Sequence, residues 1–390
     1  MRTALVSLFV LLVSAPVVHA TKLHLLVSVP KETPTGDTIY IAGSVDALGN
    51  WKADGKALTK TSEDLWSVEL DLPAGTNLEF KFNRGTWETV EKTANGDELP
   101  NRQLTVGEKD QTEQLRIAKW ASDMPVAHVA STVVGTLKLH EGFQSKALGN
   151  SRTIRVWLPP GYGKQDRTKH YPVLYMHDGQ NLFDKATSFA GEWQLDETAT
   201  KLIEDKKIEP IIIVGIDNTG VTRTDEYTPV KATLNGSDAG GKADAYAKFV
   251  IEEVKPFIDS HYQTKPEPQF TAVGGSSLGG LVSLELGRLH PEVFGKVAAV
   301  SPSLWWGGEW MLKQDMIGLA KSRVWIDMGT AEGSEASESQ ANLAQARGLA
   351  EKLKELKIDV KFVEAPDAHH NEQAWSARAG QVLAFLFPAP

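Results

Sequence analysis

The most constraining feature of this 390-residue sequence is a run of small residues, Gly274-Gly-Ser-Ser-Leu-Gly-Gly280. An apolar segment precedes the run and a helix-period segment follows it, so the chain must turn from a strand directly into a helix. Glycines allow such a tight turn because they carry no Cβ. The run fits the G-x-S-x-G pattern, in which a serine projects from a strained strand-to-helix turn. It therefore predicts Ser277 as a nucleophile; the alternative is a glycine-rich turn with an idle serine.

The part of the chain from residue 135 onward alternates between strand-like and helix-like segments. The predicted strands are Ile154–Trp157, Val173–Met176, Ile211–Ile216, Phe270–Gly274, Val297–Ser301, Val324–Met328 and Val360–Val363. The predicted helices are Ala243–His261, Leu278–Leu289, Ser339–Leu356 and Glu372–Phe387. This alternation predicts an α/β domain over residues 135–390, with a mainly parallel sheet and helices on both faces.

The preceding part of the chain, residues 21–118, has a different pattern. Short segments alternate between apolar and other residues, as at Leu23, Leu25 and Val27, and turn-forming residues separate them. This pattern predicts a small all-β sandwich. Residues 119–134 show no clear period, and we expect them to form a linker. Two domains also fit a chain of this length.

The first twenty residues are typical of a secretory signal. Arg2 supplies a positive charge, Ala4–Val13 is almost wholly apolar, and Val18-His-Ala20 resembles a cleavage site. We expect cleavage after Ala20 and a periplasmic or secreted protein; the alternative is a retained membrane anchor. The absence of cysteine suits an oxidising compartment.

Composition excludes several classes of function. Lys and Arg number 41 and Asp and Glu 50, so the net charge of −9 argues against general nucleic-acid binding. Without cysteine there is no thiolate nucleophile or thiolate metal site. Asp178–Asp184 resembles the start of a calcium loop, but its twelfth position is Phe189 rather than glutamate. We expect no metal, no cofactor, no nucleic acid, and no membrane association after signal cleavage.

A serine nucleophile needs a histidine base, and in this sheet class the base follows the serine in the chain. Three histidines follow Ser277: His290, His369 and His370. His290 ends the helix that leaves the turn and faces away from the site. The other two lie in a loop between a predicted strand and a predicted helix. We choose His370, with His369 as the alternative.

The base in turn needs a carboxylate to orient it. Glu332 follows the predicted strand Val324–Met328, at the edge where catalytic residues of α/β folds gather. We choose Glu332, with Glu335 and Asp327 as alternatives; a solvated surface charge is the remaining interpretation.

Acyl transfer also requires two N–H donors for the developing oxyanion. The residue after the nucleophile, Leu278, supplies one. The loop after an earlier strand supplies the other, and there we choose the amide of Gln180, with Gly179 as the alternative.

Six motifs occur in order along residues 135–390. They are Tyr171–Phe183, Thr222–Pro229, Val273–Gly280, Ser301–Trp306, Asp327–Gly333 and His370–Trp375. On these motifs the segment resembles the α/β-hydrolase family that includes esterase D, feruloyl esterases and enterochelin-type siderophore esterases. The resemblance implies an α/β-hydrolase fold and a triad at Ser277, His370 and Glu332, where many members carry aspartate at the acid position.

The front domain carries Ile39–Trp51, Leu65-Trp66, Phe80–Arg84 and Pro100–Arg102 in order. On these segments it resembles starch-binding carbohydrate modules. The resemblance implies a sugar-stacking site at Trp51 and Lys81 with a second tryptophan, here Trp87, which sits earlier than in the family. The alternative is that these aromatics pack in the core or between the domains.

These observations predict an exported serine carboxylic-ester hydrolase that works through an acyl-enzyme on acylated carbohydrates of the feruloyl or acetyl type. Its partners would be a small-molecule or glycan ester and a polysaccharide bound by residues 21–118. One alternative is a siderophore esterase, with Arg223 as a cationic pocket residue. Trp306 and Trp305 would stack on an acyl group or sugar, or pack in the core. A glycan-binding protein with an inert hydrolase domain is the alternative of another class.

Overall fold

A computed structural model describes residues 20–123, 130–163, 168–234 and 236–389. The signal peptide predicted for residues 1–20 lies outside these ranges, except for Ala20, and stays a prediction. The chain divides into two compact units between residues 128 and 129, and each is described by itself. Within the described ranges, none of the helices has the length and apolar character needed to cross a membrane.

The first unit is built from two four-stranded sheets, in the orders β4-β5-β1-β9 and β3-β2-β6-β8, and a short β10-β7 pair. The strands are β1 (Ala20–Ser28), β2 (Tyr40–Gly43), β3 (Lys56–Ala57), β4 (Thr59–Lys60), β5 (Leu65–Pro73), β6 (Asn77–Asn83), β7 (Glu91–Lys92), β8 (Arg102–Thr105), β9 (Gln111–Arg116) and β10 (Lys119–Trp120). Three single turns of helix join them: η1 (Asp46–Leu48), η2 (Trp87–Thr89) and η3 (Ala121–Asp123). Apolar residues from both sheets form one core, so the predicted all-β sandwich is confirmed.

The first unit extends past the predicted start of the linker at residue 119. Lys119–Trp120 forms β10, which pairs with β7. The Trp120 side chain is fully buried, and its indole Nε1 donates a hydrogen bond to Thr33 Oγ1 at 2.9 Å. The linker prediction was wrong here, because a single core tryptophan among polar residues leaves no periodic pattern.

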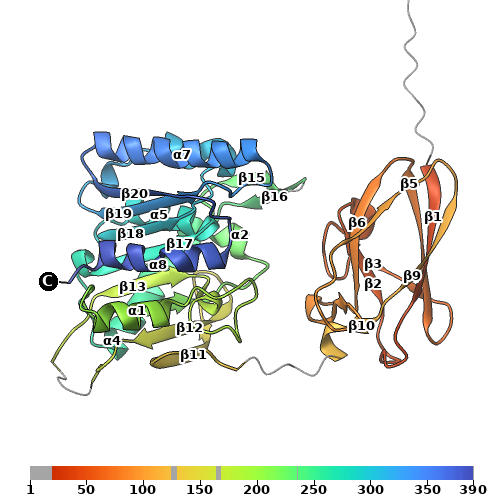
Figure 1. Cartoon of the computed structure of the whole chain (residues 1–390), viewed down its shortest axis with the longest axis horizontal. Helices are drawn as coiled ribbons and strands as arrows, with labels where there is room; N and C mark the ends of the chain where they lie inside the picture. The colour runs from red at the N-terminus through yellow and green to blue at the C-terminus, as the bar shows by residue number, and fades with distance from the viewer. Residues whose placement is uncertain (1–19, 124–129, 164–167, 235, 390) are drawn as a thin grey trace, which may run out of the picture. The chain divides into compact units, whose positions relative to one another are not determined.

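The second unit contains an eight-stranded sheet in the order β11-β12-β14-β13-β17-β18-β19-β20 (Figure 1). The strands are β11 (Thr136–Gln144), β12 (Ser151–Leu158), β13 (Val173–His177), β14 (Ile212–Ile216), β17 (Thr271–Ser276), β18 (Lys296–Val300), β19 (Arg323–Gly329) and β20 (Asp359–Ala365), with a separate hairpin of β15 (Lys231–Leu234) and β16 (Ser237–Gly240). The ladder is antiparallel between β11, β12 and β14 and parallel from β14 to β20.

Helices cover both faces of this sheet, which confirms the predicted fold class. Alternation along β13 divides the core: Val173 and Tyr175 face one side, and Leu174 and Met176 face the other. Helices α1 (Leu195–Glu204) and α8 (Glu372–Leu386) pack on the side of Leu174. The other side carries α3 (Ala243–Lys248), the π-helical turn η5 (Phe249–Val254), α4 (Lys255–His261), α5 (Leu278–Leu289) and α7 (Ala336–Glu355). The short helices are η4 (Gly179–Asn181), α2 (Arg223–Glu226), η6 (Pro268–Phe270), α6 (Trp306–Glu309), η7 (Trp310–Lys313) and η8 (Ile317–Leu319).

The carboxyl ends of the parallel strands lie at one edge of the sheet, where ligands and catalytic groups of α/β folds gather. Strands β13, β17, β19 and β20 end there at His177, Ser276, Gly329 and Ala365. Every residue predicted for the triad and the oxyanion hole lies in the segments that directly follow these strands, with Leu278 at the start of α5.

Candidate active site

Ser277 occupies a strained turn between β17 and α5. Its backbone has φ 59° and ψ −124°, a conformation that residues other than glycine rarely adopt. Glycines leave room for the turn, because a Cβ would be crowded at two positions. A Cβ at Gly275 would lie 3.0 Å from the carbonyl carbon of Gly279, and one at Gly280 would lie 3.0 Å from the carbonyl oxygen of Val300. The predicted strand–turn–helix arrangement is therefore present.

The imidazole of His370 lies between Ser277 and Glu332. His370 Nε2 is 2.9 Å from Ser277 Oγ, and His370 Nδ1 is 2.9 Å from Glu332 Oε2. The loop that carries His370 ends at Asn371, which caps α8 by accepting a hydrogen bond from the amide of Ala374. Serine, histidine and acid, from three separate loops, thus form one continuous hydrogen-bonded chain.

The alternative residues are placed elsewhere. His369 lines a shallow groove with Pro366 and Gln373. Glu335 is exposed at the start of α7, and the Asp327 carboxylate is buried beneath the site. The buried His177 at the end of β13 is no rival base either: burial lowers its pKa to about 4, and its Nδ1 lies 2.8 Å from the Tyr246 hydroxyl oxygen.

The second oxygen of Glu332 is also fixed. Glu332 Oε1 accepts hydrogen bonds from the Gly329 amide at 2.6 Å and from Ser301 Oγ at 2.5 Å. Ser301 Oγ in turn accepts from Arg378 Nη2 at 2.8 Å and from the indole of Trp375 at 3.1 Å. A carboxylate with both oxygens engaged cannot rotate away from the imidazole that it orients.

A buried ion pair lies below this acid. Arg378 Nη2 is 3.0 Å from Asp327 Oδ1 and 3.6 Å from Glu332 Oε1, so one guanidinium faces two carboxylates. The Trp325 indole donates to Asp327 Oδ2 at 2.6 Å. Burial raises the pKa of Asp327, and Arg378 opposes that rise. Asp327 therefore supports the site through Arg378 and does not contact the histidine.

The two predicted oxyanion donors stand at helix starts on the same edge of the sheet. Leu278 is the first residue of α5, and Gln180 lies in the single turn η4. Amides at helix starts have no intrahelical acceptor and remain available for an anion. The η4 turn is held in place, because Gln180 Oε1 accepts from the Asn218 amide at 3.1 Å and the Gln180 carbonyl accepts from Thr187 Oγ1 at 2.8 Å.

Family comparison agrees with this geometry. The family model described as "Putative esterase" matches residues 145–386, more than half of the chain. The chain belongs to the putative esterase family. It is a carboxylic ester hydrolase by class. A second model, "Starch binding domain", matches residues 22–115, in the first unit.

Three curated relatives match parts of the chain. "Uncharacterized protein YbbA" of Bacillus subtilis is 27% identical over 220 residues, 55% of this chain and 83% of that protein. "Endo-1,4-beta-xylanase/feruloyl esterase" of Xylanibacter ruminicola is 28% identical over 209 residues, 53% of this chain and 26% of that protein. "Iron(III) salmochelin esterase" of Escherichia coli is 28% identical over 166 residues, 41% of this chain and 34% of that protein. The chain therefore spans only a minor part of the length of these last two relatives.

Solved structures share the fold. The BES protein of Bacillus cereus superposes with a TM-score of 0.55 at 22% identity, covering 66% of this chain and 97% of that one. The enterobactin esterase of Shigella flexneri superposes with a TM-score of 0.51 at 16% identity, covering 93% of this chain and 92% of that one.

Arg223 of the esterase does not form the free cationic group that a siderophore pocket would use. Its Nε and Nη2 donate to Asp178 Oδ1 and Oδ2, each at 2.8 Å, which is a bidentate pair. Asp178 directly precedes η4, so Arg223 anchors the turn that carries the predicted oxyanion donor Gln180. Substrate binding by Arg223 therefore stays a prediction; in the structure its charge is compensated by a carboxylate that is distant in sequence.

Trp306 requires a correction. Only 1% of this residue is exposed, and its indole donates to the Val230 carbonyl at 2.8 Å. The expected stacking on substrate is therefore wrong for Trp306, which packs in the core. Its neighbour Trp305 is 47% exposed and follows Ser303, whose Oγ lies 3.3 Å from Ser277 Oγ.

Sequence reasoning missed the residues that support the acid. Ser301 and Trp375 lie inside two of the six family motifs, which mark their positions. The motifs do not reveal that these side chains support Glu332. Arg378 lies in the helical pattern of α8, where a basic residue normally indicates a solvent-facing position; in the structure it is 4% exposed.

The first unit brings together the three residues predicted to bind sugar. The ring centroids of Trp51 and Trp87 are 6.5 Å apart. With Lys81, Val90, Glu98 and Asn101 they line an open cleft of about 420 Å³. Trp87 is 41% exposed, so it does not belong to the core.

We expect Ser301→Ala to lower kcat of the esterase by about 10- to 100-fold on p-nitrophenyl acetate with little change in KM. The variant removes one hydrogen bond to the ionised acid, worth about 1.5–3 kcal/mol, and leaves the substrate contacts alone. Ser322→Ala is the control, because Ser322 is buried and its Oγ has no partner among the described residues. Wild-type kcat in a folded Ser301→Ala protein would contradict a role for Ser301 in holding Glu332.

Proposed function

We propose that the chain hydrolyses carboxylic esters through an acyl-enzyme on Ser277. The observation that carries this proposal is the chain of two 2.9 Å contacts from Ser277 Oγ through His370 to Glu332. His370 Nε2 takes the hydroxyl proton as Ser277 Oγ bonds to the ester carbonyl carbon. The carbonyl electron pair moves to oxygen, and the amides of Leu278 and Gln180 stabilise that oxyanion.

Collapse of the tetrahedral intermediate breaks the bond to the alcohol, and His370 returns its proton to that leaving group. Water then attacks the acyl-enzyme with His370 again as base, and the carboxylic acid leaves while Ser277 regains its proton. Glu332 keeps the Nδ1–H tautomer of His370 and stabilises the imidazolium. The buried Arg378–Asp327 pair keeps Glu332 in place through Ser301.

Acylated carbohydrates are the substrate class that the observations favour. The tryptophan-lined cleft of the first unit gives the chain a surface that suits a sugar ring. One relative is named as a xylanase/feruloyl esterase, and Trp305 offers an exposed aromatic face close in sequence to Ser303. The siderophore alternative is supported by the name of another relative, but Arg223 is already paired and gives that alternative no free cation.

We expect Ser277→Ala to lose on the order of 10⁶ in kcat, and Glu332→Ala to lose up to about 10⁴. A serine-directed fluorophosphonate should label the wild type and not Ser277→Ala. Glu335→Ala removes another carboxylate of the same loop and should retain activity. Damage by Glu335→Ala with an unaffected Glu332→Ala would overturn the acid assignment, and a labelled, active Ser277→Ala would overturn the nucleophile.

Substrate class can be measured by kcat/KM on a panel of feruloyl-sugar, acetyl-sugar and catecholate-trilactone esters. We expect the sugar esters to exceed the trilactone at least tenfold. The reverse order would show that the enzyme is a siderophore esterase, and comparable turnover of all three would leave no preference for acylated carbohydrates.

Sugar binding by the first unit is tested on the full chain with β-cyclodextrin in calorimetry. We expect Trp51→Ala and Trp87→Ala each to weaken binding by at least about tenfold, because tryptophans dominate such contact surfaces. Phe189→Ala, which removes an aromatic that is 70% exposed in the second unit, should leave binding unchanged. No binding by the wild type, or equal binding by all variants, would contradict a sugar site between these tryptophans.

A further inference from the structure

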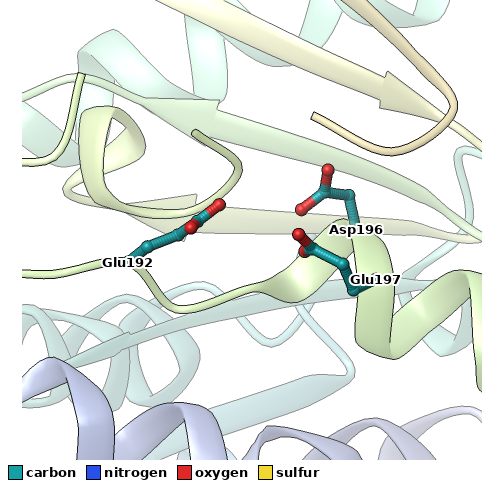
Figure 2. Close-up of side chains that lie close together, drawn as sticks. All are labelled: Glu192, Asp196 and Glu197. Atoms are coloured by element: carbon teal, nitrogen blue, oxygen red, sulfur yellow. The ribbon is translucent and has the colours of Figure 1, made fainter. Parts of the chain in front are cut away.

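Three acidic residues gather where the chain enters α1 (Figure 2). Glu192 lies on the segment before the helix, and Asp196 and Glu197 lie in its first turn. One carboxylate oxygen from each falls within 4.8 Å of the others. Figure 2 shows the three carboxylates facing one another. Acidic residues are common in first helical turns because the helix dipole favours them, so the gathering alone does not indicate a ligand.

The partners of these oxygens supply the second observation. Asp196 is fully buried; its Oδ2 accepts from the Val134 amide at 2.6 Å, but its Oδ1 has no hydrogen-bond partner in the described part of the chain. Glu197 Oε2 is likewise buried with no donor from the residues that the structure describes. Leaving such oxygens unsatisfied is costly, and native structures rarely do it.

Among the described residues, no basic side chain forms an ion pair with the cluster, although Lys185 acts on Glu192 at longer range. Arg155 on β12 pairs with Asp217, and Lys201 on α1 lies 3.4 Å from Asp205. Burial together with the neighbouring Glu197 raises the pKa of Asp196 to about 8. In the absence of a cation, one proton shared between the two carboxyl groups is therefore the competing way to satisfy this site.

We propose that Glu192, Asp196 and Glu197 bind a divalent cation, with Ca²⁺ as the best-matched ion. Carboxylate oxygens are the ligands that hard cations prefer, and they do not suit thiophilic metals. Calcium–oxygen distances of about 2.3–2.6 Å allow two oxygens on one ion to lie up to about 5 Å apart, which accommodates the spacing seen here. Magnesium usually keeps several waters and seldom uses an all-protein cage, so it fits a buried cluster less well.

The ion would fasten the start of the second unit onto α1. Thr132 Oγ1 donates to Glu192 Oε1 at 2.7 Å, and Val134 donates to Asp196, so the segment that leads into β11 already rests on the cluster. Trp193 lies between Glu192 and Asp196 in the sequence and packs on Trp375 with ring centroids 5.9 Å apart. Trp375 meets the His370 ring edge-on at 5.0 Å. The ion therefore acts on stability and positioning and takes no part in the ester chemistry.

The sequence pattern that resembled a calcium loop is not this site. Asp178 at its start pairs with Arg223. Asp184 accepts hydrogen bonds from Ser131 Oγ and from the amides of Thr132 and Ala186.

The test uses the full-length protein stripped of metal with a chelator and then titrated with CaCl₂. We expect the unfolding temperature of the second unit to rise saturably, by about 5–10 °C at a hundredfold excess over Kd. Tb³⁺ should show luminescence sensitised by Trp193 that excess Ca²⁺ displaces. Neither readout depends on ester turnover, so this proposal can fail while the proposed function stands.

Variants assign the response to the cluster. Asp196→Asn and Glu197→Gln should abolish both responses, and Glu192→Gln should weaken them. Glu204→Gln, at the other end of α1, is the matched control and should respond like the wild type. If Asp196→Asn does not fold, Glu192→Gln serves for the comparison, because Glu192 is partly exposed. A stripped wild type that shows neither response would overturn the proposal in favour of the shared proton, and an undiminished response in folded Asp196→Asn or Glu197→Gln would place the ion elsewhere.

Discussion

The sharp turn at Ser277 is the constraint on which the rest of the second unit depends. A non-glycine residue with φ 59° persists only where its surroundings hold it. The Ser277 amide donates to the Val300 carbonyl at 3.1 Å, and the Ser277 carbonyl accepts from the Leu281 and Ser303 amides at 3.1 and 3.0 Å. The neighbouring strand β18 and helix α5 therefore fix the turn from both sides. The hydroxyl consequently points beyond the sheet edge, where the loops after β19 and β20 can reach it.

The acid side of the site is arranged around a buried charge. Glu332 is 9% exposed as a residue, yet each of its oxygens has a partner, so the cost of burying it is offset locally. Arg378 brings one positive charge between Glu332 and Asp327, which keeps two carboxylates from facing each other without a cation. The acidic cluster at the start of α1 has no such ion pair among the described residues, and two of its buried oxygens have no donor there, which is the basis for expecting an ion.

Features with strong local signals could be predicted from the sequence. Helix α5 begins and ends at the predicted residues, because glycines mark its start and apolar residues fill its length. Edge strand β11 was not predicted, since its residues are mostly exposed and a bulge interrupts its pairing with β12. Helix α1 was also missed, because it is short and largely polar outside a few buried positions.

The residues of the candidate site also divide into those with a local sequence signal and those without one. Chain order and motif position predicted Ser277, His370 and Glu332, whose side chains lie within hydrogen-bond distance in sequence from serine to acid. The partner of a charged side chain could not be predicted in this way. Arg223 and Asp178 are 45 residues apart, and no local pattern in the sequence connects them. Two adjacent tryptophans present a further limit, because only the fold determines that Trp306 points inward while Trp305 points outward.

The pairing of Arg223 with Asp178 has a consequence for how substrate preference could change over evolution. A side chain that braces the loop contributing an oxyanion donor is costly to replace, because any new selectivity gained there would come with slower acyl transfer. Substitutions that alter preference without loss of rate should instead fall at exposed side chains such as Phe189, Val221 and Trp305. On this arrangement, catalytic rate and substrate preference would depend on different residues of this chain.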